Sequence, residues 1–333
     1  MTEVAPSPPP GAPPVGTPAG VEHAAPAAEL AEDLFRTVAA VVRGKDDVVR
    51  LAVVALLAGG HLLVEDLPGT GKTLLAKSLA TALGGRFGRV QCTPDLLPSD
   101  ITGTSVYSPG DGSWSFRPGP LFANVVLVDE INRASPRTQA ALLEPMEEQQ
   151  VTADGRTHPL PDPFFCVATQ NPFGQVGTFP LPESQLDRFA LVLSMGLPGR
   201  DAERDILTGR GGTDAFEDVR AVSTPAGVAA AVDSVRHVYA APAAVEYVLD
   251  LTAATRAHPE LSVGASPRAS VGLLHAARAH AAVAGRTHVI PDDAQAVAGP
   301  AFAHRVAVRG AVDTVAARAV IADIVVNTPV PRS

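Results

Sequence analysis

The stretch HLLVEDLPGTGKTLLAKSLATAL, residues 61–83, decides the fold of this chain. Its first five residues, His61–Glu65, form a short apolar run that predicts a buried strand. A proline and two glycines follow, and they predict a tight loop. From Thr73 to Leu83 the apolar residues recur at helical spacing. The stretch therefore predicts a strand, a tight loop and a helix.

Three more apolar runs predict further buried strands: Val125–Val128, Phe164–Ala168 and Leu191–Leu193. Before the first strand, Leu30–Val41 and Val48–Leu56 carry apolar residues at the spacing of two amphipathic helices. Continuous apolar strands that alternate with helices are typical of a parallel sheet covered on both faces. The fold class that we expect for residues 29–197 is therefore α/β, a parallel sheet sandwiched by helices.

The ends of the chain differ from this pattern. Residues 1–28 contain eight prolines and no Leu, Ile or Phe, so they cannot bury enough apolar surface to offset the entropy of ordering, and we expect a disordered tail. Beyond the last predicted strand no strand pattern remains. We expect a connector over 198–235, a smaller all-helical domain over 236–327 and a short tail over 328–333. Within the helical domain, Pro291-Asp292-Asp293 is a plausible helix start.

The charge balance is acidic. The 333 residues include 26 Lys+Arg against 35 Asp+Glu, which gives a formal net charge of −9. This balance argues against non-specific binding to a polyanion, because such binding depends on neutralising phosphates. Only three of the cations are lysines, Lys45, Lys72 and Lys77, so each of them is conspicuous.

Other compositional features bear on the compartment. Cys92 and Cys166 lie far apart with no spacing for a metal or redox pair, and the nine histidines show no paired spacing for a metal. No basic segment followed by an apolar core begins the chain, so we expect no signal peptide. The most apolar stretch, Leu51–Val64, is too short to span a bilayer. We expect a reduced, cytoplasmic protein without membrane insertion.

The loop after the first strand matches a phosphate-binding pattern. Its residues are Asp66, Leu67, Pro68, Gly69, Thr70, Gly71, Lys72 and Thr73, and they follow G-x-x-x-x-G-K-[ST] except that Asp66 replaces the first glycine. Glycines let backbone N–H groups curl around a β-phosphate at a helix N-terminus. We expect Lys72 to reach the β- and γ-phosphates and the Thr73 hydroxyl to hold Mg²⁺. The carboxylate of Asp66 would repel phosphates, so its side chain is expected to face away.

Two acidic residues end the strand at 125–128. Asp129 is placed to coordinate Mg²⁺, directly or through water, and Glu130 to orient and polarise an attacking water. A solvated strand end is the better interpretation of such a pair when it stands alone. Downstream of a phosphate-binding loop, the pair instead indicates the second half of a nucleotide site.

Six segments together closely resemble the MoxR family of AAA+ ATPases: DEINRA (129–134), QAALLE (139–144), MEE (146–148), ATQNP (168–172), LDRF (186–189) and GASPRA (264–269). The resemblance runs from about Val42 to His304, with the motifs in the family's order. It implies a P-loop AAA+ core with a C-terminal all-helical lid domain. It also implies ATP and Mg²⁺ as cofactors, and a homo-oligomeric ring, usually a hexamer.

The resemblance assigns roles to three further residues. Asn171 matches the sensor-1 asparagine that holds the attacking water, and a turn-forming asparagine is the alternative. Arg188 matches the arginine finger that reaches the γ-phosphate of the neighbouring subunit, and an ion pair to Asp187 or Glu183 is the alternative. Arg268 matches the sensor-2 arginine, which contacts the γ-phosphate in its own subunit, and a surface arginine is the alternative.

Two hairpins are predicted on either side of the Asp129 strand. The first, Tyr107–Phe116, has the turn 108–112 and the chain's one tryptophan, and it would be an insertion within the helix before that strand. The second, Glu148–Leu160, has Ala153-Asp154-Gly155-Arg156 at its tip. In related rings such hairpins face the pore or the substrate, so both are candidates for partner contact.

The leading hypothesis is an oligomeric ATPase that binds ATP between core and lid and remodels a protein client. Family resemblance implies clients that often carry a von Willebrand factor A domain. Arg133 and Arg137 face either the neighbouring subunit's nucleotide or ion pairs on their own helix. A nucleotide-gated switch with little turnover is the second hypothesis. The third is a DNA-remodelling ring, which the acidic charge and the lack of a DNA-binding motif disfavour, so we expect no nucleic-acid partner.

Overall fold

The computed structural model describes residues 21–110, 112–171, 177–310 and 314–331. Its centre is a five-stranded, all-parallel sheet with strand order β2-β5-β8-β1-β9. The strands are β1 (His61–Glu65), β2 (Phe87–Gln91), β5 (Val125–Asp129), β8 (Phe165–Gln170) and β9 (Phe189–Leu193). The four predicted strands and the parallel sheet are confirmed. The edge strand β2 was not predicted, because its exposed Arg89 and Gln91 break the apolar run.

Neighbouring strands end at the same edge of this sheet. Glu65 at the end of β1 lies opposite Gln170 of β8, and Gln91 at the end of β2 lies opposite Asp129 of β5. The loop that carries the phosphate-binding pattern follows β1 directly and leads into α3 (Lys72–Ala82). The carboxyl edge of the sheet therefore gathers that loop and the acidic pair.

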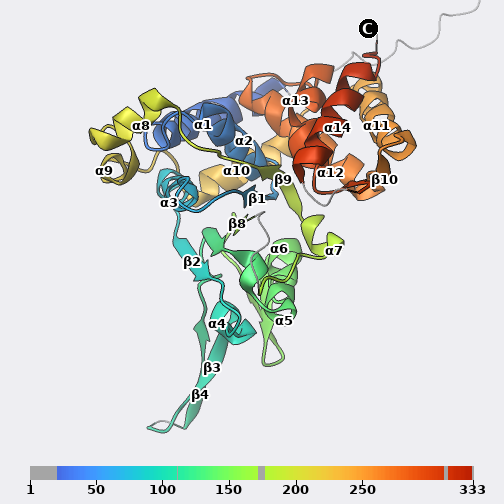
Figure 1. The fold of residues 1–333 in the computed structure, drawn as a ribbon. Coiled ribbons are helices and arrows are strands. Elements are labelled where there is room, and N and C mark those ends of the chain that lie inside the picture. The colour runs from blue at the N-terminus through green and yellow to red at the C-terminus, as the bar shows by residue number, and fades with distance from the viewer. Residues whose placement is uncertain (1–20, 111, 172–176, 311–313, 332–333) are drawn as a thin grey trace, which may run out of the picture.

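Alternate strand residues face two different helical layers. Leu62, Val64 and their in-phase neighbours point to the layer with α1 (Val21–Ala39), α2 (Asp46–Leu57), α3 and α10 (Pro225–Arg236). Leu63 and its in-phase neighbours point to the opposite layer, which holds α4 (Pro98–Thr102), α5 (Pro136–Ala140), α6 (Leu143–Glu148) and the 3₁₀ turn Ile131–Arg133. The sheet is thus covered on both faces, with the blue and orange helices on one side and the green ones on the other (Figure 1).

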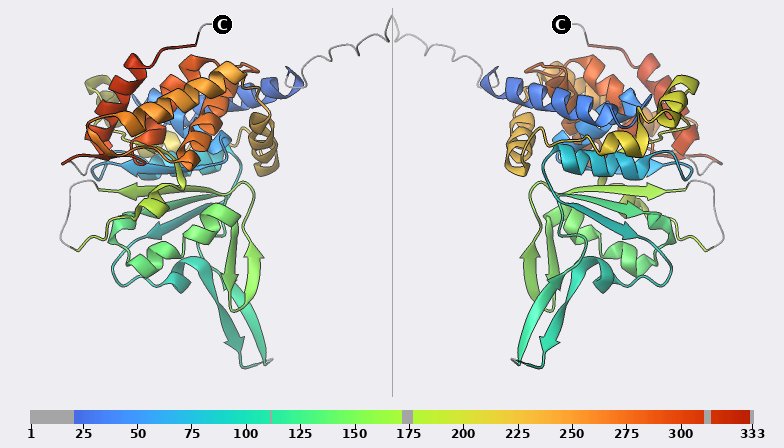
Figure 2. Two further views of the ribbon diagram at one scale, coloured as in Figure 1. Left: turned by 90° about the vertical axis from the view of Figure 1, so that its right-hand side faces the viewer. Right: turned by 90° about the vertical axis from the view of Figure 1, so that its left-hand side faces the viewer.

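The lid helices are α11 (Pro242–Ala257), α12 (Pro267–Val283), α13 (Pro291–Phe302) and α14 (Thr314–Asn327). They are accompanied by two short antiparallel strands, β10 (Leu261–Val263) and β11 (Ala307–Val308), which the prediction of an all-helical domain did not include. α12 packs against α1, α2 and α10, and its buried alanines belong to the same apolar cluster as those helices. The lid therefore shares its core with one helical layer of the α/β domain (Figure 2).

Two predicted boundaries were wrong. α1 begins at Val21, inside the range expected to be a tail, because Ala27, Ala31 and Leu34 form a buried face. The expected connector 198–235 contains α8 (Arg200–Leu207), α9 (Gly212–Phe216) and α10. α8 has no buried residue, so its sequence shows no apolar periodicity. The buried face of α10 consists of valine and alanine, which give a weak helical pattern. Residues 1–20 of the predicted tail lie outside the described part of the chain.

Both predicted hairpins are present, as β3 (Gly103–Ser108) with β4 (Ser113–Pro118), and β6 (Gln150–Ala153) with β7 (Arg156–Pro159). Asp154 and Gly155 have φ of 51° and 73°, as a type I′ turn requires. Asp111 of the first turn lies outside the described residues. The first hairpin follows α4, but the described residues between β4 and β5 form turns and bends and no helix resumes there, which corrects the predicted insertion within a helix.

The first hairpin extends well away from the body of the molecule (Figure 1). At its base, the ring of Phe116 stacks on His158 of the second hairpin, with 3.9 Å between ring centroids and 12° between planes. The two hairpins are thus joined at their bases. Separately, no helix in the described ranges is both long and apolar enough to cross a membrane.

Candidate nucleotide-binding site

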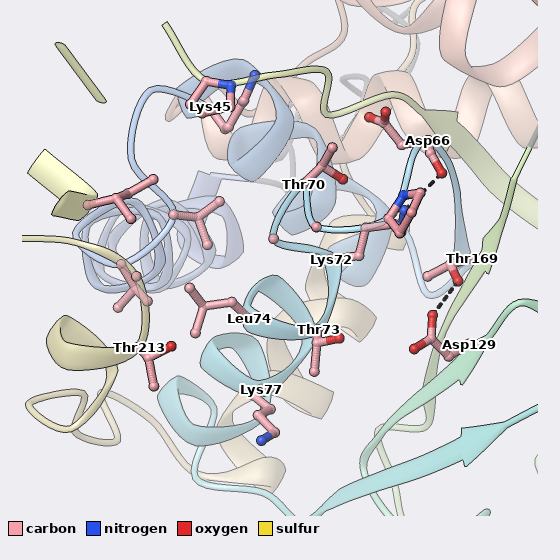
Figure 3. Close-up of a pocket in the computed structure, with 18 of the residues that line it drawn as sticks. Lys45, Asp66, Thr70, Lys72, Thr73, Leu74, Lys77, Asp129, Thr169 and Thr213 are labelled. Carbon is pink, nitrogen blue, oxygen red and sulfur yellow. Dashed lines mark hydrogen bonds between the residues drawn. The ribbon is translucent and has the colours of Figure 1, made fainter. Parts of the chain in front are cut away.

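A pocket of about 610 Å³ opens at the carboxyl edge of the sheet. It is lined by the phosphate-pattern loop, by Asp129 and Glu130, and by Thr169–Asn171 at the end of β8. All three lysines of the chain line it, as Figure 3 shows. Of the predicted loop residues, Leu67 alone does not line the pocket, and its side chain is exposed.

The loop has the geometry that phosphate binding requires. Gly69 and Gly71 have φ of 84° and 96°, which favours glycine, and Gly71 is the N-cap of α3. The N–H groups of the first turn of α3 have no partner within the helix, so they are available to an anion. The ammonium of Lys72 donates to the carbonyls of Asp66 at 2.9 Å and Leu67 at 2.6 Å. Burial lowers the pKa of Lys72, although three nearby carboxylates act in the opposite direction.

Asp66 braces the loop from outside. Its Oδ2 accepts hydrogen bonds from the Gly196 backbone N–H and from the Ser194 hydroxyl, and its Oδ1 accepts one from the Leu67 N–H. The carboxylate thus points toward the chain after β9, and Figure 3 shows it turned away from Lys72. Asp66, which replaces the first glycine of the consensus pattern, therefore links the phosphate loop to the segment that follows β9.

Asp129 and Glu130 are held by a residue to which the sequence analysis gave no role. The hydroxyl of Thr169 donates to Asp129 Oδ1 at 2.7 Å and accepts from the Glu130 backbone N–H at 2.9 Å. Thr169 is 1% exposed. Glu130 has φ of 56°, which is strained for a residue other than glycine and common at functional sites. The sequence offered one signal for this role: Thr169 lies near the end of the strand that was predicted to lie beside Asp129.

Each of these carboxylates also pairs with an arginine. Asp129 Oδ2 accepts from Arg89 of β2 at 2.8 Å, and Glu130 Oε2 accepts from Arg133 at 2.8 Å. The Gln91 amide donates to the same Glu130 oxygen at 3.4 Å. Arg133 therefore forms an ion pair near its own turn, which was one of its two predicted roles.

Asn171 lines the pocket at the end of β8, and its backbone carbonyl accepts from the Asn132 side chain at 3.4 Å. Pro172, the next residue of the motif, lies outside the described residues. Arg137 is exposed on α5.

The other wall of the pocket corrects the expectation that nucleotide binds between core and lid. It comes from the segment that joins α1 and α2 and from the region once expected to be a connector, and its apolar members are Val41, Val42, Pro198, Ile206 and Phe216. Within the described part of the chain, the lining ends at Phe216, so no lid residue contributes. Lys45 joins the two segments of this wall, because its ammonium donates to the Leu197 carbonyl at 2.6 Å. This apolar end suits a planar base, and the loop suits its phosphates.

Arg188 and Arg268 lie elsewhere. Arg188 precedes β9, whose first residue, Phe189, pairs with His61 at the start of β1. It is therefore at the amino edge of the sheet, about 13 Å of strand away from the phosphate loop. Arg268 does not line the pocket either. It forms ion pairs with Glu147 and Asp187 beside Arg188, which corrects the predicted contact with a γ-phosphate in its own subunit.

The pocket residues fit magnesium as well as a nucleotide. The Thr73 hydroxyl and the Asp129 carboxylate offer the hard oxygen ligands that Mg²⁺ prefers, and both line the pocket. Backbone N–H groups and Lys72 supply the positive field that a polyphosphate needs. The set is therefore chemically complete for a Mg²⁺–nucleoside triphosphate.

Two family models match the chain. The ATPase family associated with various cellular activities (AAA) matches residues 61–191, and the AAA lid domain matches residues 253–324. The chain is 44% identical to YeaC of Bacillus subtilis over 88% of its own length and 93% of that protein. It is 39% identical to Chaperone MoxR1 of Mycobacterium tuberculosis over 86% and 78% of the two chains. A crystal structure from Cytophaga hutchinsonii, that of a candidate ATPase, superposes with a TM-score of 0.83 at 32% identity, covering 93% of this chain and 98% of that one.

Proposed function

Because the chain belongs to the MoxR family of AAA+ ATPases, we propose that it hydrolyses ATP in a ring of identical subunits and uses the energy to remodel or activate a protein client. One observation carries the hydrolytic part of the proposal. A single pocket brings together Lys72, the acidic pair Asp129-Glu130 and Asn171, which come from the carboxyl-end segments of three separate strands, β1, β5 and β8.

Each residue has a distinct task in this mechanism. The loop N–H groups and Lys72 bind the β- and γ-phosphates, while Val41 and Phe216 contact the base. Thr73 and Asp129 would hold Mg²⁺, which would supply charge neutralisation on the phosphates. Glu130 and Asn171 orient the water that attacks the γ-phosphorus in line with the departing ADP.

The neighbouring subunit completes the site in this proposal. Arg188 and Arg268 lie at the amino edge, so neither reaches the pocket of its own subunit. A head-to-tail ring places the amino edge of one subunit against the carboxyl edge of the next. Both guanidinium groups then stabilise the charge on the transferring phosphoryl group. The ring, with six members by family resemblance, is thus required for turnover.

In this proposal the two hairpins contact the client. Tyr107 and Trp114 form an exposed aromatic pair, with centroids 5.2 Å apart, on the hairpin β3–β4, and this hairpin projects beyond the nucleotide core. A chaperone role agrees with the name of the mycobacterial relative. We propose a protein client, with a von Willebrand factor A domain as the first candidate to test, and no nucleic-acid partner.

Steady-state ATP hydrolysis across a protein concentration series tests this function. The rate of ATP hydrolysis should rise more than linearly with protein concentration as rings assemble. Lys72→Ala should lose ATP binding, whereas Glu130→Gln should bind ATP and hardly hydrolyse it. Equal turnover in Glu130→Gln and the parent protein would refute the role assigned to Glu130.

A second candidate function, an ATP-gated switch with little turnover, has one observation in its favour. Arg89 and Arg133 pair with the two carboxylates that hydrolysis needs, so both must be released before the site works. A switch predicts ATP binding with turnover near zero at every protein concentration. The concentration series therefore separates the two functions.

A further inference from the structure

Five charged side chains form an alternating chain of ion pairs at the amino edge of the sheet. In order they are Arg188, Glu147, Arg268, Asp187 and Arg305. They come from α6, from the segment between α7 (Glu183–Leu186) and β9, from the first turn of α12 and from the turn that follows α13. The cluster thus joins the lid to the sheet on the side away from the nucleotide pocket.

Glu147 contacts both of the arginines to which we assign contact with ATP. Its Oε2 accepts from Arg188 Nη2 at 2.5 Å, and its Oε1 lies 3.3 Å from Arg268 Nη2. Two guanidinium groups so close would repel each other without an anion between them. Because each carboxylate oxygen faces a different arginine, Glu147 fixes the separation of the pair.

Asp187, the other carboxylate of the cluster, does not bridge Arg188 and Arg268. Asp187 uses Oδ1 for Arg305, which is only 6% exposed, and its Oδ2 lies 3.5 Å from Arg268 Nε. Among the described residues, the side chains of Asp187 and Arg188 form no ion pair or hydrogen bond with each other. Asp187 therefore joins two lid arginines, Arg268 and Arg305, to the segment before β9. Of the two carboxylates, only Glu147 bridges the side chains of Arg268 and Arg188.

Glu147 is itself fixed in place. The residue before it, Met146, offers its carbonyl to the imidazole of His61 at 2.8 Å. His61 is 3% exposed and is the first residue of β1. The end of α6 is thus attached to the strand that carries the phosphate loop, which gives the arginine pair a rigid support.

We propose that Glu147 is a positioning residue that holds Arg188 and Arg268 as one unit for the γ-phosphate bound by the neighbouring subunit. This inference rests on the proposed function, since it requires a ring that hydrolyses ATP. The proposal makes turnover depend on Glu147, a residue that does not line the nucleotide pocket.

Turnover and ATP affinity of Glu147→Ala test the proposal, with Glu148→Ala as the matched control. Glu148 is an exposed carboxylate on the same helix and bonds only to Gln150 among the described residues. In Glu147→Ala the turnover at saturating ATP should fall about 10- to 100-fold, the cost of misplacing a catalytic group by about 1 Å. ATP affinity should stay unchanged, because Glu147 does not line the pocket. Glu148→Ala should match the parent protein.

Mixed rings distinguish positioning in trans from a structural defect. Glu147→Ala subunits keep an intact pocket, and Lys72→Ala subunits keep an intact arginine pair. When the two variants are mixed 1:1, about one interface in four places the pocket of a Glu147→Ala subunit against the arginine pair of a Lys72→Ala subunit. Turnover in the mixed rings should therefore recover to about a quarter of the parent value. In a background that lacks both Arg188 and Arg268, Glu147→Ala should have no further effect.

The outcomes separate the two proposals. If the parent protein hydrolyses ATP cooperatively but Glu147→Ala matches Glu148→Ala, or if mixing restores nothing, the role of Glu147 is overturned while the ATPase stands. If the parent protein shows no turnover at any concentration, the proposed function fails and this inference fails with it.

Discussion

Thr169→Val is the sharpest test of how the catalytic carboxylates are held. Valine keeps the shape of the buried side chain but removes the hydroxyl that donates to Asp129 and accepts from the Glu130 N–H. A hydrogen bond to a charged group contributes about 1.5–3 kcal/mol, and a buried N–H left without an acceptor costs about 1–3 kcal/mol. Together these contributions predict a loss of about 2.5–6 kcal/mol in the free energy of unfolding.

The effect on turnover should exceed the effect on binding. Without Thr169 nothing else described in the structure accepts from the Glu130 N–H, and the left-handed backbone at Glu130 can relax. A shift of about 1 Å in Glu130 should lower turnover about 10- to 100-fold. ATP affinity should change much less, because the phosphate loop is intact.

The assay combines urea unfolding, ATP titration and steady-state turnover for Thr169→Val and Thr169→Ser. Serine retains the hydroxyl and should keep most of the stability and turnover. A valine variant with the turnover and stability of the parent protein would refute the reasoning that Thr169 holds the acidic pair.

Three further predictions concern other parts of the fold. Burial lowers the pKa of His61 to about 4, while its hydrogen bond to the Met146 carbonyl acts in the opposite direction. Unfolding then takes up a proton between pH 6.5 and 4, so His61 should make the protein about 2 kcal/mol less stable at pH 5 than at pH 7. His61→Gln should flatten the pH dependence of urea unfolding in that window, and an unchanged slope would contradict this. Asp66→Ala should cost about 1–3 kcal/mol in urea unfolding, because it leaves the Gly196 N–H without its acceptor. The same variant should retain ATP binding, whereas a loss as large as that of Lys72→Ala would contradict the bracing role. Trp114, 69% exposed, should emit fluorescence like indole in water in the isolated subunit. Its emission should not change when ATP is added, and a shift would show that the hairpin responds to nucleotide.

The nucleotide half of the site could be predicted from local patterns. The run before Asp66 and the run ending at Asp129 are buried on both faces, so continuous apolar sequence identified them. The Asp154-Gly155 turn likewise has a backbone requirement that few residue pairs meet. In each case the signal lies within a few neighbouring residues.

The rest depends on contacts that no local pattern encodes. β2 alternates exposed and buried residues at the sheet edge, and α8 has no buried residue, so neither has an apolar signature. Arg268 was assigned to its own subunit's nucleotide because the sequence does not reveal where a lid packs. Thr169 belongs to a recognised motif, but its hydroxyl acquires a role only through the strand pairing that places it beside Asp129.

The core shared by the lid and the helical layer has a mechanical consequence for the subunit and for the ring that we propose. Ala276 and Ala277 of α12 are fully buried in the cluster that also contains Leu34 of α1 and Val53 of α2. Swinging the lid away would expose many such side chains to water, at about 25 cal/mol for every Å² of apolar surface. The lid is therefore held rigidly against the core within one subunit. In the ring that we propose, movement driven by ATP would then occur at the interfaces between subunits, with each subunit rotating as a rigid body together with its projecting hairpins.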